Sequence, residues 1–202
     1  MSSSRLLALV RAEGDEHADV LDAALSAFLD FGIRRTSMSE IARRAGISPA
    51  TLYRRFAQKA EIVQAVGLRE VRRFLDSVDT EVDPEASGEE QVVTLFVAFL
   101  GGLRRNKLLA RLIATEPESV LPALTVQGAP VLGLGRDYLV GVIERLQRAG
   151  LAEEFDPLPL AEMLARVALS LALTPETVLP LRDDAKARDF ARRHIAVAYR
   201  LT

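Results

Sequence analysis

Basic side chains gather in one short segment of the chain, and their number predicts contact with an anionic partner. Between Phe31 and Lys59 there are seven basic residues and a single acid, Glu40, so the segment carries a local charge of +6. The 202-residue chain as a whole has a net charge of −2, which leaves −8 for the remainder. A basic segment on an acidic protein favours one local binding surface over general adhesion to polyanions.

Other chemistry has little support in the residue types. The chain has no cysteine, which excludes thiol catalysis, disulfides and cysteine-bound metals. Its two histidines, His17 and His194, are far apart in the sequence. The Gly-Lys-Ser/Thr phosphate loop, the His-Glu-x-x-His motif and the Gly-x-Ser-x-Gly motif are all missing. The sequence therefore predicts a protein that is not an enzyme and uses no metal or cofactor.

Apolar residues recur at three- and four-residue spacing, and strand signals are scarce, so the segment is predicted to be helical. Helices must therefore position the basic residues. A first helix is expected over about residues 17–31, with Gly32 at its end. Ser37-Met-Ser-Glu40 fits a capping box that opens a second helix. Ser48-Pro49 opens a third, to about residue 56. Gly46-Ile47-Ser48 joins the last two, so the pair predicts a helix-turn-helix.

The whole chain is expected to be all-α, with about nine helices. We expect an N-terminal three-helix domain that holds the helix-turn-helix over residues 1–58, and a helical body over residues 59–202. The longest uncharged stretch, from Ser119 to Gly135, holds two prolines and does not fit a membrane span. The apolar run Leu6 to Val10 is too short for a secretory signal, so a cytoplasmic location is expected.

The segment from Val20 to Val66 resembles the N-terminal domain of TetR-type transcriptional regulators. It covers about a quarter of the chain, and the rest is similar to the family only in length and helicity. The features that carry the resemblance are the Ala-Ala…Phe…Gly pattern of the first helix, Thr36-Ser-Met-Ser-Glu-Ile-Ala, Ala45-Gly-Ile-Ser, Thr51-Leu-Tyr-Arg-Arg-Phe, and Lys59 three residues after Phe56.

The third helix would enter the major groove of double-stranded DNA by its N-terminal face. Thr51 is expected to hydrogen-bond a base edge, while the small Pro49 and Ala50 allow close approach or contact a thymine methyl group. The resemblance implies that Tyr53 touches phosphate, that Arg54 touches base or phosphate, and that Lys59 clamps a phosphate. Further DNA contacts are expected from Thr36, Ser37, Arg44 and Ser48.

Each assignment has a plainer alternative. The arginines can form a solvated charged face, and Arg43 and Arg44 are neighbours on one helix, so both cannot point at DNA. Tyr53 can instead belong to the core. Leu52 and Phe56 are expected in the core.

The C-terminal half is expected to form a homodimer. In the helix over about residues 158–173, the polar side chains after the start form one stripe at i, i+4, i+8, so the helix needs cover on two sides. The last helix, about residues 183–199, would complete a four-helix interface like those of the family. The alternative is that both helices close the monomer core. The candidate interface residues are Glu162, Arg166, Phe190, Ile195 and Tyr199.

The resemblance also implies an effector cavity in the helical body, walled partly by an amphipathic helix over about residues 129–149. Apolar walls would favour a hydrophobic or amphipathic small molecule. Candidate wall residues are Phe96, Phe99 and Tyr138, with Arg111 or Glu116 as a polar anchor. Each of these residues alone also fits ordinary packing or an exposed surface.

These observations predict a dimeric, ligand-responsive bacterial DNA-binding regulator of the TetR type, most simply a repressor of a palindromic operator. Two other hypotheses remain open at this point. One is a dimeric DNA-binding protein with no effector, and the other is a helical protein-interaction module.

Overall fold

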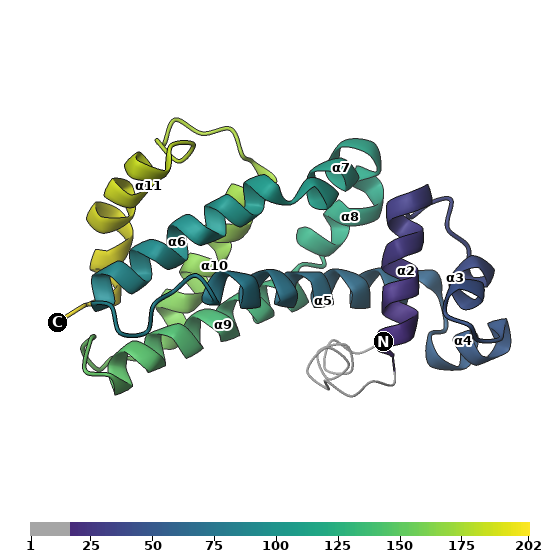
Figure 1. Ribbon diagram of the computed structural model, residues 1–202, viewed down its shortest axis with the longest axis horizontal. Helices are drawn as coiled ribbons and strands as arrows, with labels where there is room; N and C mark the ends of the chain where they lie inside the picture. Colours follow the sequence, from purple (N-terminus) through teal and green to yellow (C-terminus); the bar gives the residue numbers. More distant parts are fainter. Residues whose placement is uncertain (1–16) are drawn as a thin grey trace. The chain divides into compact units, whose positions relative to one another are not determined.

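The computed structural model describes residues 17–202, and it confirms the all-α fold class. Among these residues the extended structure is limited to one isolated bridge between Ala152 and Leu201. No helix in the described part is long and apolar enough to cross a membrane. The helices in chain order (Figure 1) are α2 (Ala18–Phe31), α3 (Met38–Arg44), α4 (Pro49–Arg55), α5 (Lys59–Asp79), α6 (Gly88–Arg105), α7 (Lys107–Thr115), α8 (Pro117–Leu124), α9 (Ala129–Arg148), α10 (Pro157–Leu173) and α11 (Asp184–Phe190).

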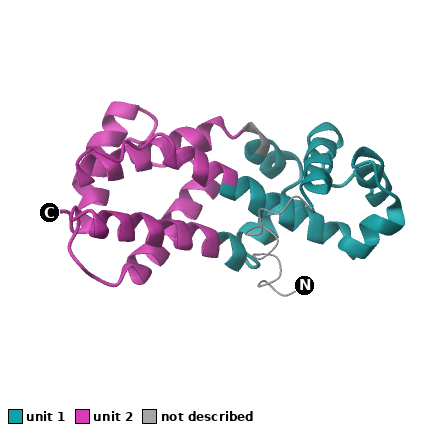
Figure 2. Ribbon diagram, turned by 60° about the horizontal axis from the view of Figure 1, so that its bottom comes forward, with its two compact units in different colours: residues 1–72, 107–131 teal, residues 73–106, 132–202 magenta. Residues whose placement is uncertain are grey.

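The chain forms two compact units, drawn in separate colours in Figure 2. Of the described residues, unit 1 comprises 17–72 and 107–131, and unit 2 comprises 73–106 and 132–202. Unit 1 therefore includes α7 and α8 as well as the three N-terminal helices and most of α5. The functional boundary after residue 58 stays a prediction.

Polar side chains fix where several helices begin. The Ser37 hydroxyl accepts a hydrogen bond from the Glu40 amide at α3, and Ser48 does the same for the Thr51 amide at α4. Ser87, Asp156 and Asp183 cap α6, α10 and α11 in the same way. Such caps satisfy amide groups that have no partner within the helix.

The core of unit 1 includes the apolar faces of α2, α3, α4 and α5. Ala24 of α2, Ile41 of α3, Leu52 of α4 and Ile62 of α5 are all fully buried. Phe56, which ends α4, is also fully buried. Because α3 and α4 are only seven residues long, this shared core rather than helix propensity must hold them in place.

Unit 2 encloses a second core between α6, α9 and α10, with the C-terminal segment packed against it. The chain beyond α11 differs from the single helix expected over residues 183–199. After Phe190 the backbone forms a π turn over Ala191–Ile195 and a 3-10 turn over Ala196–Tyr199. Arg200 then takes a left-handed conformation, with φ of 48°, which ends the helical segment.

Candidate nucleic-acid interface

The turn between α3 and α4 has the geometry that a helix-turn-helix needs. Gly46 has φ of +68°, a conformation that glycine adopts without strain. The Ile47 amide donates to the Ala42 carbonyl at 3.0 Å, and the Gly46 amide donates to the Arg43 carbonyl at 3.3 Å. This pair of bonds closes the end of α3 and sends the chain directly into α4.

The short helix α4 presents small and polar side chains outward. Pro49, Ala50 and Arg54 are exposed, and Tyr53 is 53% exposed. The structure therefore places Tyr53 on the surface rather than in the core, whereas Leu52 and Phe56 are buried as expected. The face of α4 that carries these exposed residues is the part of the site that best fits a DNA groove.

Two hydroxyl groups meet at the start of α4. The Oγ of Ser48 lies 2.9 Å from the Oγ1 of Thr51, and it also accepts from the Thr51 amide at 3.1 Å. The Thr51 side chain is half-buried, and its hydroxyl lies against the cap, where either of the two hydroxyls can be the donor. A hydroxyl placed in this way is suited to a directional contact with a base edge.

Of the two residues directly before α3, only Ser37 has the exposed side chain that the predicted phosphate contacts require. Thr36 is only 2% exposed, and its hydroxyl donates to the Gly32 carbonyl at 2.7 Å within reach of the Ala27 carbonyl. Its side chain is therefore enclosed and has no access to a phosphate, which corrects the expected contact. Ser37 is exposed, and its Oγ already accepts from the Glu40 amide at 3.1 Å, so its hydroxyl proton can still point outward.

Glu40, the single acid of the basic segment, binds two arginines. Its carboxylate accepts from Arg43 Nε and Nη2 at 2.9 and 2.7 Å, and from Arg44 Nε at 2.8 Å. Hydrogen bonds from Arg43 and then Arg44 lower the pKa of Glu40 to about 2. The carboxylate therefore faces the arginines, while only the Ser37 hydroxyl supplies the cap of α3.

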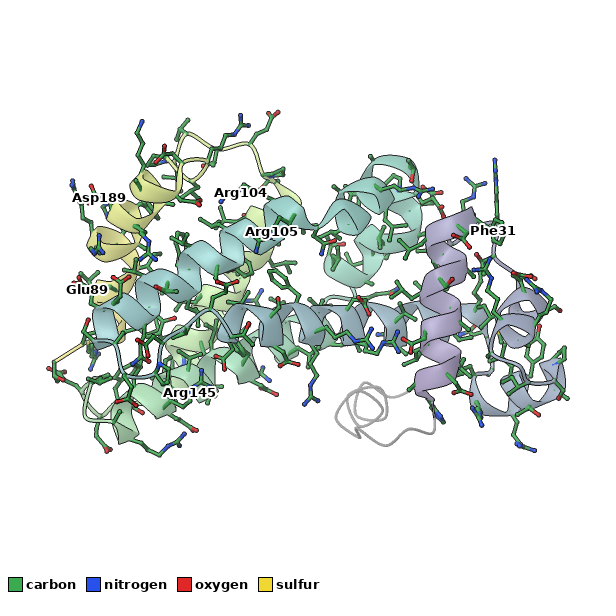
Figure 3. All side chains as sticks on the ribbon, viewed as in Figure 1. Phe31, Glu89, Arg104, Arg105, Arg145 and Asp189 are labelled. Carbon is green, nitrogen blue, oxygen red and sulfur yellow. The ribbon has the colours of Figure 1, made fainter. Side chains whose placement is uncertain are left out.

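The Arg44 guanidinium is bound by other side chains of unit 1. Its guanidinium reaches Ser26 Oγ at 2.8 Å and Asp30 at 2.7 Å, and it stacks over the ring of Phe31 at 5.0 Å. Phe31 is labelled at the end of α2 in Figure 3. Only 18% of the Arg44 side chain is exposed, so the expected DNA contact is corrected to a structural one. Arg43 is 70% exposed on the same helix.

Lys59 also turns inward. Its ammonium group donates to the carbonyls of Ile33 at 2.7 Å, Thr36 at 2.9 Å and Arg34 at 3.2 Å. An ammonium has three protons, and these three carbonyls occupy all of them. In this conformation Lys59 has no donor left for a phosphate, so the structure gives it the role of holding the segment between α2 and α3.

The candidate effector residues are divided between the two units. Arg111 and Glu116 belong to unit 1, where Arg111 donates to the Leu29 carbonyl at 3.0 Å and Glu116 accepts from the Arg34 amide at 2.8 Å. Sequence separations of 82 residues hide both contacts from any local pattern.

Phe96, Phe99 and Tyr138 belong to unit 2, where they are half-buried. The Tyr138 hydroxyl donates to Asp79 at 3.1 Å, and Arg145 (Figure 3) donates to the same carboxylate oxygen at 2.6 Å. Burial, followed by the neighbouring Asp79 charge, raises the pKa of Tyr138, so its hydroxyl stays protonated.

The candidate dimer residues occupy different environments in unit 2. Glu162 and Arg166 form an ion pair on α10 at 2.6 Å, and Arg166 is 64% exposed. Phe190 and Ile195 are half-buried. Tyr199 is only 1% exposed and belongs to the core of unit 2, so its side chain is corrected from an interface residue to a core residue.

The comparison with known proteins agrees with this geometry. Residues 20–66, which contain both short helices and the turn, match the family model of the bacterial regulatory proteins of the tetR family. An uncharacterized HTH-type transcriptional regulator of Mycobacterium bovis is 29% identical over 184 residues, which cover 89% of this chain and 92% of the relative. Residues 20–66 are therefore a TetR-type N-terminal domain.

Solved structures share the fold of the chain along most of its length. The TetR family repressor AlkX from a Dietzia strain, implicated in biodegradation of n-alkanes, has a TM-score of 0.69 at 21% identity and covers 89% of this chain and 97% of its own. FadR from Thermus thermophilus, a repressor in complex with lauroyl-CoA, has a TM-score of 0.58 at 20% identity, covering 90% and 93%. The matched domain and the curated relative support DNA-binding transcriptional regulation, and regulators of this type are not enzymes.

Proposed function

We propose that this protein acts as a homodimer on a palindromic operator and represses transcription until a small effector releases it. The observation that carries the proposal is the exposed surface of α4, which presents Pro49, Ala50, Tyr53 and Arg54, together with the Thr51 hydroxyl 2.9 Å from Ser48 at its start. In a dimer, two such helices would enter successive major grooves, whose centres are about 34–36 Å apart.

Dimerisation is supported by the outer face of α10. Ala161 and Ala165 are buried against the core of unit 2, whereas Met163 and Val167, on the opposite side of the helix, are 52% and 45% exposed. Nearby, α9 and α10 line a hollow of about 310 Å³, whose lining includes Leu132, Leu169 and Leu173. Apolar surface of this kind on a helix otherwise packed in the core is typical of protein–protein interfaces.

The effector is proposed to be hydrophobic or amphipathic. The lauroyl-CoA bound by the Thermus repressor is a molecule of this kind, with an apolar chain and a charged head. The half-buried aromatic residues Phe96 and Phe99 of α6 remain candidates for the wall of its site. An effector that favours one dimer geometry by about 1–3 kcal/mol is enough to change operator occupancy severalfold or more.

Selection of DNA fragments from a random-sequence pool tests the operator. We expect the wild-type protein to enrich an inverted repeat, with the half-sites about one helical turn apart or slightly more. The variant Thr51→Ala should then lose discrimination at one base pair per half-site, by about 1–3 kcal/mol. If the protein enriches no sequence even at low salt, the operator proposal fails and the protein-interaction hypothesis gains.

The effector is tested separately with lauroyl-CoA and free lauric acid as probes. We expect at least one of them to raise the melting temperature of the protein and to release it from the selected DNA. If neither probe nor other acyl compounds change melting or DNA binding, a dimeric regulator with no effector replaces the proposal.

A further inference from the structure

The segment of residues 32–36, which joins α2 to α3, is bound by charged groups from two other helices of unit 1. The ammonium of Lys59, at the start of α5, binds three of its carbonyls. The carboxylate of Glu116, directly before α8, binds the amide of Arg34. The segment leads into Ser37 and hence into the helix-turn-helix, so whatever fixes it also fixes the direction in which α3 and α4 leave α2.

Glu116 fits this segment closely. One carboxylate oxygen, Oε2, accepts from the Arg34 amide at 2.8 Å. The other, Oε1, lies so near Gly32 that a Cβ on that residue would come within 2.0 Å of it. Gly32 has φ of 81° and ψ of 161°, a region that essentially only glycine occupies. Glycine at this position thus provides both the backbone conformation and the space that the carboxylate fills.

A second contact links residues 107–131 to the end of α2. Arg111 of α7 donates to the carbonyl of Leu29, in the last turn of α2. Together with Glu116 it binds the end of α2 and the segment that follows. Residues 107–131 accordingly group with the helix-turn-helix in unit 1.

We propose that Glu116 is a positioning residue for DNA recognition, and that α7 and α8 form part of the DNA-binding unit. Glu116 acts through the segment 32–36, whose position sets the angle at which α3 and α4 meet the double helix. It does not bind the phosphate backbone, because a carboxylate offers only acceptors to phosphates, which are also acceptors. This inference rests on the DNA-binding function assigned above.

The negative charge of Glu116 makes it possible to distinguish a positioning role from a direct electrostatic effect on DNA affinity. Removing an acidic side chain from a DNA-binding unit weakens repulsion of phosphate, so on charge alone it should strengthen DNA binding. Positioning predicts the opposite, a weaker and less selective complex. Glu118 provides the matched control, because it lies two residues further on and pairs with the Arg34 side chain in an exposed contact of 3.3 Å.

The experiment compares Glu116→Ala, Glu116→Gln and Glu118→Ala on DNA that the wild-type protein selects from a random pool. We expect Glu116→Ala to bind the selected fragment about tenfold more weakly, which is the loss of one hydrogen bond to a charged group. Glu116→Gln should recover most of the affinity, because an amide oxygen can still accept from Arg34. Glu118→Ala should bind as tightly as wild type or more tightly.

The ratio of affinities for selected and unrelated DNA is the deciding measurement. Partial unfolding reduces only the concentration of active protein and therefore lowers both affinities by the same factor. Loss of positioning lowers the ratio. The proposal is overturned if Glu116→Ala keeps the wild-type ratio, or if Glu116→Ala and Glu118→Ala behave alike. Failure of the wild-type protein to select any DNA would instead refute the operator proposal.

Discussion

Lys59 and Arg54 carry the same charge in the same basic segment, but they differ in the groups that they already contact. The three protons of the Lys59 ammonium are donated to carbonyls at the start of the helix-turn-helix. Arg54 projects from the exposed face of α4. A cation contributes to the salt dependence of DNA binding only if it neutralises a phosphate, so the two residues should behave differently.

Lys59→Ala should destabilise the protein by about 1–3 kcal/mol, because the carbonyls of the segment lose a charged donor. The slope of log K against log salt concentration should stay at its wild-type value. Arg54→Ala is the comparison, and its slope should become shallower by about 0.9, as expected for one lost phosphate contact. Urea unfolding and DNA binding across a salt series give both quantities. A shallower slope for Lys59→Ala would show that Lys59 reaches DNA after all.

At the scale of elements, α4 shows how a seven-residue helix is held in position. It is too short to be stable alone, so it depends on its cap and on the core. Ser48 satisfies the Thr51 amide at one end, while Leu52 and Phe56 are fully buried along its inner face. The outer face remains free to vary without loss of fold, which suits a helix that reads DNA.

Removing the Ser48 cap should therefore affect both stability and recognition. Ser48→Ala is expected to cost about 1 kcal/mol of stability and to weaken binding to the selected DNA, because the Thr51 hydroxyl also loses its partner. Ser87→Ala is the control, since Ser87 caps α6 in unit 2 with the same geometry. It should lower the melting temperature to a similar extent and leave DNA affinity unchanged. Equal DNA binding by both variants would contradict this account of α4.

At the scale of the whole molecule, one side of α10 is left uncovered by the described residues 17–202. Met163 and Val167 are exposed one turn apart, while the residues on the opposite side are enclosed in the core of unit 2. The hollow beside them is lined by leucines and bordered by Arg166, Ser170 and Thr174. Association with a second copy would remove this apolar surface from water.

Val167→Glu should convert the proposed dimer to a monomer, because it places an unpaired charge inside the interface. Val178→Glu is the matched control, since Val178 is fully exposed between α10 and α11 and should leave the dimer intact. Analytical ultracentrifugation of both variants measures the assembly. The monomeric variant should also lose affinity for the full inverted repeat. A dimeric Val167→Glu protein would place the interface elsewhere.

The sequence by itself determined the local features of this protein. The starts of α3 and α4 follow from Ser37 and Ser48, and the turn between them follows from Gly46, because each depends on contacts within about five residues. The helical fold class likewise came from periodicity, and the resemblance to a known family came from the motifs between Val20 and Val66. The exposed residues of α4 were predicted as a set, because burial of Leu52 and Phe56 fixes which side of a helix faces outward.

Only the tertiary structure decided which charged and polar groups are available. Thr36 and Lys59 match the family motif, but packing encloses the first and turns the second toward the backbone. Glu116, expected near an effector, binds Arg34 from 82 residues away. These outcomes depend on long-range contacts between helices, and a side chain of given type can face solvent or a carbonyl depending on what folds against it. No spacing within the sequence encodes that choice.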